Sequence, residues 1–132
     1  YPEYVCCIFS TAVFIKSYHL RNAYKILKNS KNIDYVFSAH KVDRSFLRSF
    51  NINKDFCVKK MKFPNLYNSR SQDLDQVFVD SGQFYFAKAS TFLKEKKVFT
   101  SKSKIIDLSQ LKVIDINYLE DWKKAEIILK KK

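Results

Sequence analysis

Three short polar segments contain the side chains that could do chemistry in this sequence. They are Arg70–Leu74 (RSQDL), Asp80–Tyr85 (DSGQFY) and Asp115–Asn117 (DIN). Residues two apart on a strand point to the same side, so Asp115 and Asn117 could hold one cation between their oxygens. Magnesium suits such a site, because it takes one or two carboxylates together with substrate phosphates. The alternative from the pattern alone is that Asn117 caps a helix and Asp115 complements the helix dipole.

The composition excludes several other kinds of site. The 132 residues contain one glycine, Gly82, where average usage would give roughly nine. That count excludes the glycine-rich loops that bind dinucleotides or triphosphates, and also the GxSxG turn of serine hydrolases. The three cysteines form no CxxC pair and the two histidines have no metal-ligand partner at helical spacing, so neither a zinc site nor a disulfide framework is predicted. This cysteine usage, with no secretory leader recognised, predicts a cytoplasmic protein.

The chain is strongly basic, with 25 Lys and Arg against 13 Asp and Glu, a net charge of +12. An excess of this size raises the alternative of a nucleic-acid-binding module. However, the aromatic residues fall mostly at the spacing of a core, and no motif interleaves them with arginine as a base-stacking surface would require. We therefore expect a solvated, lysine-rich surface, with neither a nucleic acid nor a membrane as partner. The longest apolar run, 4–15, is shorter than the roughly 20 residues of a membrane-spanning helix.

The elements that must position these residues follow an α/β pattern. Residues 4–10 form a continuous apolar run, typical of a strand buried on both faces in a parallel sheet. A helix capped by Ser17 is predicted next, because apolar residues recur at helical spacing from Leu20 to Leu27. A second strand over 33–39 then completes a right-handed βαβ unit.

The remaining chain is expected to alternate between irregular and regular structure. Residues 41–76 are polar and basic and favour short antiparallel strands. The later elements are a strand over 77–87 interrupted at 80–82, a helix over 88–96, strands over 104–108 and 113–116, and a closing helix from Leu119 to Leu129 capped by Asn117. Ligands of open α/β sheets bind at the carboxyl ends of the strands, which is where Asp115 and Asn117 would then lie.

Four segments resemble, in order and spacing, the acylneuraminate cytidylyltransferases (CMP-sugar-acid synthetases), most closely the pseudaminic acid branch. Residues 4–15, YVCCIFSTAVFI, are similar to that branch's YVCCIYPTAPFI, and RSQDL follows at 70–74. DSGQFYF at 80–86 is similar to DAGQFYW. Asp115-Ile-Asn and Asp121-Trp122 are similar to DIDTxxDW. The resemblance implies a Rossmann-like nucleotidyltransferase sheet with helices on its faces, and a small antiparallel segment at 41–76 that projects and helps to form a homodimer.

The resemblance also implies a reaction and a set of site residues. The reaction is cytidylyl transfer from CTP to a nine-carbon sugar acid of the pseudaminic or sialic type, with pyrophosphate released and Mg²⁺ as cofactor. Asp115 matches a catalytic, metal-binding aspartate, with Asn117 in the second metal position. Arg70 matches an arginine suited to hold the sugar carboxylate. The full set of substrate-side residues is Arg70, Gln72, Gln83 and Tyr85, and the nucleotide side is Thr11 and Ala12.

Three departures from the family's pattern bear on activity. Asn117 stands where the family has its second aspartate, and Ser10 and Val13 stand where it has prolines. The glycine-rich triphosphate loop has no counterpart. We therefore expect residues 1–132 to form a single partial domain, the C-terminal portion of such an enzyme, incomplete at its N-terminus and inactive alone. Strand 4–10 would then be exposed, because its usual neighbours are missing. An inactive, truncated remnant of the family is the alternative.

Overall fold

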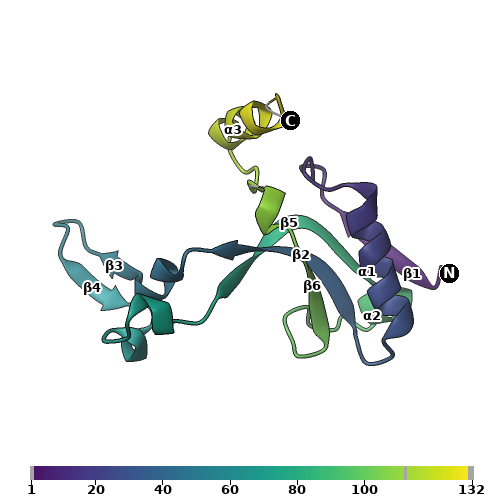
Figure 1. Cartoon of the computed structure of the whole chain (residues 1–132), viewed down its shortest axis with the longest axis horizontal. Helices are drawn as coiled ribbons and strands as arrows, with labels where there is room; N and C mark the ends of the chain where they lie inside the picture. The colour runs from purple at the N-terminus through teal and green to yellow at the C-terminus, as the bar shows by residue number, and fades with distance from the viewer. Residues whose placement is uncertain (1, 112, 131–132) are drawn as a thin grey trace. The chain divides into compact units, whose positions relative to one another are not determined.

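The computed structural model describes residues 2–111 and 113–130 (Figure 1). The chain divides into two compact units, one formed by Tyr1–His40 with Asp80–Lys132 and the other by Lys41–Val79. We call them the sheet unit and the hairpin unit. The chain passes from the sheet unit into the hairpin unit along strand β2 (Tyr35–Val42) and returns along strand β5 (Val77–Lys88).

The sheet unit is built on a mixed four-stranded sheet, and the α/β class is therefore confirmed. The strand order is β1 (Tyr4–Ile8), β5, β2 and β6 (Ser103–Asp107). β6 is parallel to β2, but β1 is antiparallel to β5, so the prediction of a parallel sheet is only partly right. β1 is an outer strand and its Ile8 is 48% exposed. An apolar run reports strand propensity and does not by itself reveal how many neighbours a strand has.

Helix α1 (Ser17–Asn29) covers one face of the sheet and forms the core with it (Figure 1). Ala23 and Leu27 of this helix pack against Val36 of β2 and Phe84 of β5, and all four are at most 1% exposed. The helix has the predicted extent, but the prediction that Ser17 caps it is wrong. The cap position is Lys16, whose backbone N–H donates to Nδ1 of His19 at 2.9 Å.

Aromatic contacts line the opposite face of the sheet. Tyr35 and Phe37 flank Val36 along β2, so their side chains point away from α1. Tyr35 meets Phe92 of helix α2 (Ala89–Leu93) edge to face, with ring centroids 5.4 Å apart. Phe37 stacks on Tyr85 of β5 at 5.9 Å. The sheet therefore presents Tyr85 on the face opposite its helical cover.

Two expectations near the polar segments are corrected. β5 is one continuous strand of 12 residues and is not interrupted at 80–82. Gly82 adopts a positive φ of +58° within the strand, which glycine tolerates. Residues 113–116 do not form a strand, and the described residues between the 3₁₀ turn Ser109–Leu111 and helix α3 (Leu119–Lys130), which are 113–118, form no regular element. Within the part of the chain that the structure describes, no helix is both long and apolar enough to cross a membrane.

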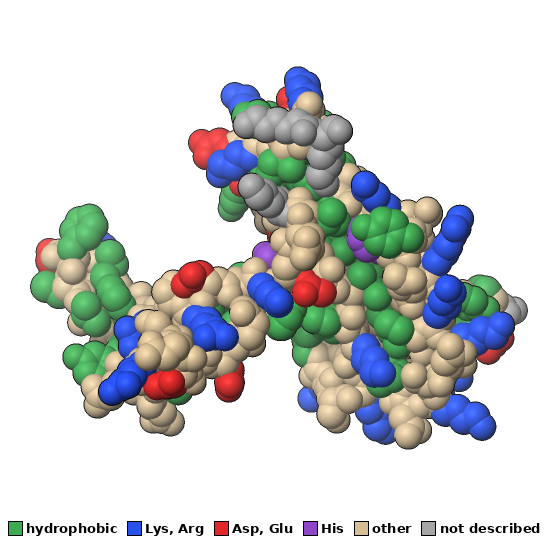
Figure 2. Space-filling model, in the orientation of Figure 1, with side chains coloured by type: hydrophobic (Ala, Val, Ile, Leu, Met, Phe, Trp, Pro, Cys, Tyr) green, Lys and Arg blue, Asp and Glu red, His purple; other side chains and the backbone are tan. Residues whose placement is uncertain are grey.

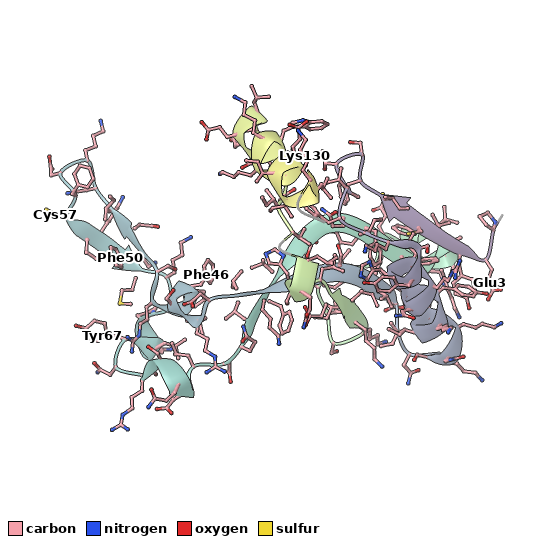
Figure 3. The ribbon with its side chains drawn as sticks, turned by 45° about the horizontal axis from the view of Figure 1, so that its top comes forward. Glu3, Phe46, Phe50, Cys57, Tyr67 and Lys130 are labelled. Carbon is pink, nitrogen blue, oxygen red and sulfur yellow. The ribbon has the colours of Figure 1, made fainter. Side chains whose placement is uncertain are left out.

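The hairpin unit confirms the predicted short antiparallel strands. β3 (Phe50–Ile52) pairs with β4 (Val58–Met61), and three 3₁₀ turns accompany them at Arg44–Arg48, Pro64–Leu66 and Ser71–Asp73. Apolar side chains lie on the surface of this unit (Figure 2), and Figure 3 labels three of them, Phe46, Phe50 and Tyr67. The exposed large apolar residues of the unit include Phe46, Phe50, Ile52, Phe56, Val58 and Tyr67. The predicted projecting segment 41–76 lies within this unit.

Candidate active site

Gly82 of β5 lies directly against the carboxylate of Asp115. A Cβ atom at position 82 would lie 3.0 Å from Asp115 Oδ1 and 3.4 Å from its Cγ, closer than side chains normally pack. Gly82 also has a φ of +58°, in the left-handed region that favours glycine. The only glycine of the sequence is therefore used where two of the three polar segments meet.

Asp115 and Asn117 face one another although they are not on a strand. The Asn117 Nδ2 donates to Asp115 Oδ2 at 3.0 Å, and both side chains are exposed. Asn117 does not cap the helix that follows. Asp121 Oδ2 accepts the backbone N–H groups of Asn117 at 3.3 Å and Tyr118 at 3.1 Å, so Asp121 reaches back from the first turn of α3. The prediction of Asn117 as a helix cap is therefore wrong.

Asp80 joins the turn at Gly82 to the side chain of Tyr85. Its Oδ1 accepts the backbone N–H of Gly82 at 2.9 Å, and its Oδ2 accepts the Tyr85 hydroxyl. Desolvation raises the pKa of Tyr85 above its usual range, and the hydrogen bond to Asp80 and the nearby charges of Asp80, Cys7 and Asp115 add to the shift. Tyr85 is thus held neutral, with its hydroxyl as a donor.

Two polar residues of this region were not singled out by their spacing. Ser81 is fully buried next to Gly82, and its Oγ lies 3.0 Å from Nδ1 of His40 on β2. Asp80 was noted only as the first residue of the DSGQFY segment, without its contacts to Gly82 and Tyr85. Nothing in the sequence connects positions 40 and 81, because the contact depends on which strands are neighbours in the sheet.

The predicted nucleotide-side residues lie in the loop between β1 and α1. The N–H of Ala12 donates to the Phe9 carbonyl at 3.0 Å, and the N–H of Val13 donates to the Thr11 carbonyl at 2.9 Å. Thr11 and Ala12 are half-buried. The loop therefore forms a tight turn here without the prolines of the family's motif.

The predicted substrate-side residues are divided between the two units. Gln83 and Tyr85 are on β5 in the sheet unit, whereas Arg70 and Gln72 are exposed residues of the hairpin unit. Arg70 precedes a 3₁₀ turn, where its carbonyl accepts the N–H of Asp73 at 3.0 Å. The Gln72 carbonyl accepts Nη1 of Arg44 at 3.2 Å.

The residues around Asp115 fit a magnesium site completed by substrate. Among residues 2–111 and 113–130, no three His, Cys, Asp or Glu side chains gather closely enough to hold a metal. Asp115 has an exposed carboxylate, and the exposed side chain of Asn117 turns its Nδ2 toward it, so the Asn117 oxygen would face a shared cation only after a half-turn of the amide group. Magnesium commonly binds through one or two carboxylates and completes its shell with water and phosphate oxygens, so the Asp115 carboxylate is compatible with such a site.

The comparisons with known proteins find relatives that are described as pseudaminic acid cytidylyltransferases. The chain is homologous to pseudaminic acid cytidylyltransferases, which confirms the resemblance found in its motifs. It is 31% identical over 129 residues to the pseudaminic acid cytidylyltransferases of two Campylobacter jejuni strains, serotypes O:23/36 and O:2. These matches cover 97% of the chain and 54% of each relative, so the chain spans about half the length of these relatives.

A third relative is a longer protein of Helicobacter pylori, described as a pseudaminic acid cytidylyltransferase and UDP-2,4-diacetamido-2,4,6-trideoxy-beta-L-altropyranose hydrolase. It is 31% identical over 121 residues, which is 92% of this chain and 23% of that protein. No protein-family model matches the chain.

Proposed function

We propose that this chain forms part of an enzyme that transfers a cytidylyl group from CTP to a nine-carbon sugar acid of the pseudaminic acid type. Homology to pseudaminic acid cytidylyltransferases over 97% of the chain supports the proposal. The mixed sheet, covered by α1 on one face, is compatible with part of a Rossmann-like nucleotidyltransferase sheet.

The contact between Gly82 and Asp115 is the observation that carries the proposal. It brings the DSGQFY and DIN segments together, 33 positions apart in the sequence. One side of the Asp115 carboxylate rests on Gly82, while the side chain as a whole stays exposed. The carboxylate therefore rests against Gly82 on one side and is still accessible to a ligand on the other.

The transfer needs positioning and charge stabilisation more than covalent chemistry by the protein. A sugar hydroxyl attacks the α-phosphorus of CTP, a new P–O bond forms, pyrophosphate leaves with the electrons of the broken bond, and the hydroxyl proton is released. When bound, magnesium neutralises charge on the phosphates. Asp115 would hold it with the Asn117 amide oxygen, which replaces Nδ2 after a half-turn of the amide group.

Arg70 is the residue proposed to select the acid. A guanidinium pairs with a carboxylate through two parallel hydrogen bonds, a geometry that an ammonium cannot reproduce. Arg70→Lys is therefore expected to raise KM for the sugar acid while KM for CTP stays unchanged. Equal increases in both KM values would show that Arg70 does not recognise the sugar.

We also propose that the complete enzyme is a homodimer formed through the hairpin unit. Phe50, Phe56 and Val58 of its two strands and their connecting turn are 52%, 83% and 61% exposed. Such a cluster of apolar side chains is typical of a surface that is covered by a partner. Phe56→Ser with Val58→Ser is expected to shift the complete enzyme from dimer to monomer in analytical ultracentrifugation.

The test uses a joined protein, in which this chain is fused to the part of the Campylobacter jejuni enzyme that it does not cover. Pyrophosphate release is measured with CTP, pseudaminic acid and magnesium. We expect release by the joined protein and none by the 132-residue chain alone. If the joined protein is inactive but its Asn117→Asp variant is active, the chain is an inactive remnant of the family. If both are inactive, the proposal is wrong.

A further inference from the structure

Gln83 is a buried residue whose polar groups are all used inside the protein. It is 1% exposed, next to Gly82 on β5. Its side-chain Nε2 donates to the carbonyls of Ser81 at 3.1 Å and Gly82 at 3.4 Å, and its Oε1 accepts the backbone N–H of Phe14 at 3.4 Å. Its own backbone N–H donates to Ser38 Oγ at 3.1 Å. No polar atom of Gln83 is left over for a substrate.

The bonds of Gln83 hold both ends of the loop that joins β1 to α1. At the start of the loop, the N–H of Phe9 donates to the backbone carbonyl of Gln83 at 3.0 Å. At its end, the N–H of Phe14 donates to the Gln83 side chain. Thr11 and Ala12, the predicted nucleotide-side residues, lie between these two points. One residue of β5 therefore fixes the span of the loop.

The orientation of the Gln83 amide follows from its partners. Two backbone carbonyls face one end, and these can only accept, so the Nε2 donor must lie there. A backbone N–H faces the other end, so the oxygen must lie there. The same side chain thus ties the loop to the carbonyl of Gly82, the residue that rests against Asp115.

We propose that Gln83 is a positioning residue, which holds the loop 9–14 at a set distance from Gly82 and Asp115 without touching the substrate. The resemblance alone would place Gln83 among the residues that bind the sugar acid. Burial and internal bonding favour the role in positioning, because both ends of the buried amide already have partners within the protein. The link to the nucleotide side rests on the proposed function, whereas the attachment of the loop does not.

The first test measures hydrogen exchange of single backbone amides in the 132-residue chain. Gln83→Met keeps the approximate size of the side chain and removes both ends of its amide. The Phe14 amide should then exchange about five- to tenfold faster, the size expected for the loss of one hydrogen bond. The Phe9 amide is an internal control, because its acceptor is the Gln83 backbone carbonyl, which the variant retains.

Phe84→Leu is the matched control variant. Phe84 is the next residue of β5, is 0% exposed and packs into the core under α1. This variant weakens the same strand without removing a polar contact of the loop, so any acceleration should be similar at Phe9 and Phe14. If Gln83→Met also changes both amides equally, or neither, the proposed attachment is wrong.

The second test separates positioning from binding in the joined protein. Gln83→Met should raise KM for CTP at least fivefold and leave KM for the sugar acid within twofold, because the loop carries the nucleotide-side residues. A rise confined to the sugar acid would show that Gln83 contacts the sugar and would overturn the proposal. If the parent joined protein has no activity, the proposed function fails, and the exchange of Phe14 relative to Phe9 still decides whether Gln83 holds the loop.

Discussion

Replacing Gly82 by alanine tests the contact on which the candidate site depends. The substitution has two separable costs. The first is backbone strain, because φ is +58° and an L-residue in the left-handed region costs about 1–2 kcal/mol. The second is the approach of the new Cβ to 3.0 Å from Asp115 Oδ1, which forces the carboxylate to move by a few tenths of an ångström.

The two costs should appear in different measurements. Asp115 is exposed and can move at little expense, so the free energy of unfolding in urea should fall by about 1–2 kcal/mol from the backbone alone. The displacement should appear in turnover by the joined protein, as a loss of about three- to tenfold, since a 1 Å misplacement can cost about a hundredfold. The stability loss should persist when Gly82→Ala is combined with Asp115→Ala. An unchanged free energy of unfolding would refute the conformational reasoning, and unchanged turnover would show that the contact lies outside the reacting region.

Three further predictions concern the surroundings of this contact. Asn117→Asp should strengthen magnesium binding several-fold, measured by titration calorimetry with CTP present, because a second carboxylate then faces Asp115; unchanged affinity would exclude position 117 as a ligand. Asp121→Ala should reduce stability by about 0.5–2 kcal/mol and speed hydrogen exchange of the Tyr118 amide, since the acceptor at the start of α3 is lost. Because the pKa of Tyr85 is raised in the folded protein, its contribution to the free energy of unfolding is fully present below pH 10 and is lost as the pH rises further. Above pH 10 the Tyr85 hydroxyl ionises in the unfolded chain but stays neutral in the folded protein. Urea unfolding between pH 9 and 11 should show this fall, and Tyr85→Phe should reduce it.

Local patterns predicted the elements that depend on near neighbours. The extent of α1 was correct because Ala23 and Leu27 recur at helical spacing and both face the core. The short antiparallel strands were predicted from the polar, irregular character of 41–76, and β3 and β4 do pair within this segment, across residues 53–57. These signals lie within a few residues of the structure that they describe.

Errors arose where a residue's role depends on a distant partner. The direction in which β1 pairs depends on β5, about 80 positions later, and the apolar run carries no information about it. The residue type of Asn117 indicates a cap for the closing helix, but the backbone N–H groups of Asn117 and Tyr118 donate to the side chain of Asp121 instead. Strand geometry predicted that the side chains of Asp115 and Asn117 lie on the same side. They do contact one another, but in an irregular segment whose Asp115 lies against Gly82.

The position of Asp115 is the centre of this account, so its removal is the most direct test. Pyrophosphate release by the joined protein is measured for Asp115→Asn, which keeps the size of the side chain and removes its charge. Glu126→Gln, which neutralises an exposed carboxylate of α3, is the matched control. We expect Asp115→Asn to lose at least a hundredfold in magnesium-dependent turnover while Glu126→Gln stays within twofold of the parent. Retention of turnover by Asp115→Asn, or an equal loss in both variants, would contradict the assignment of the site.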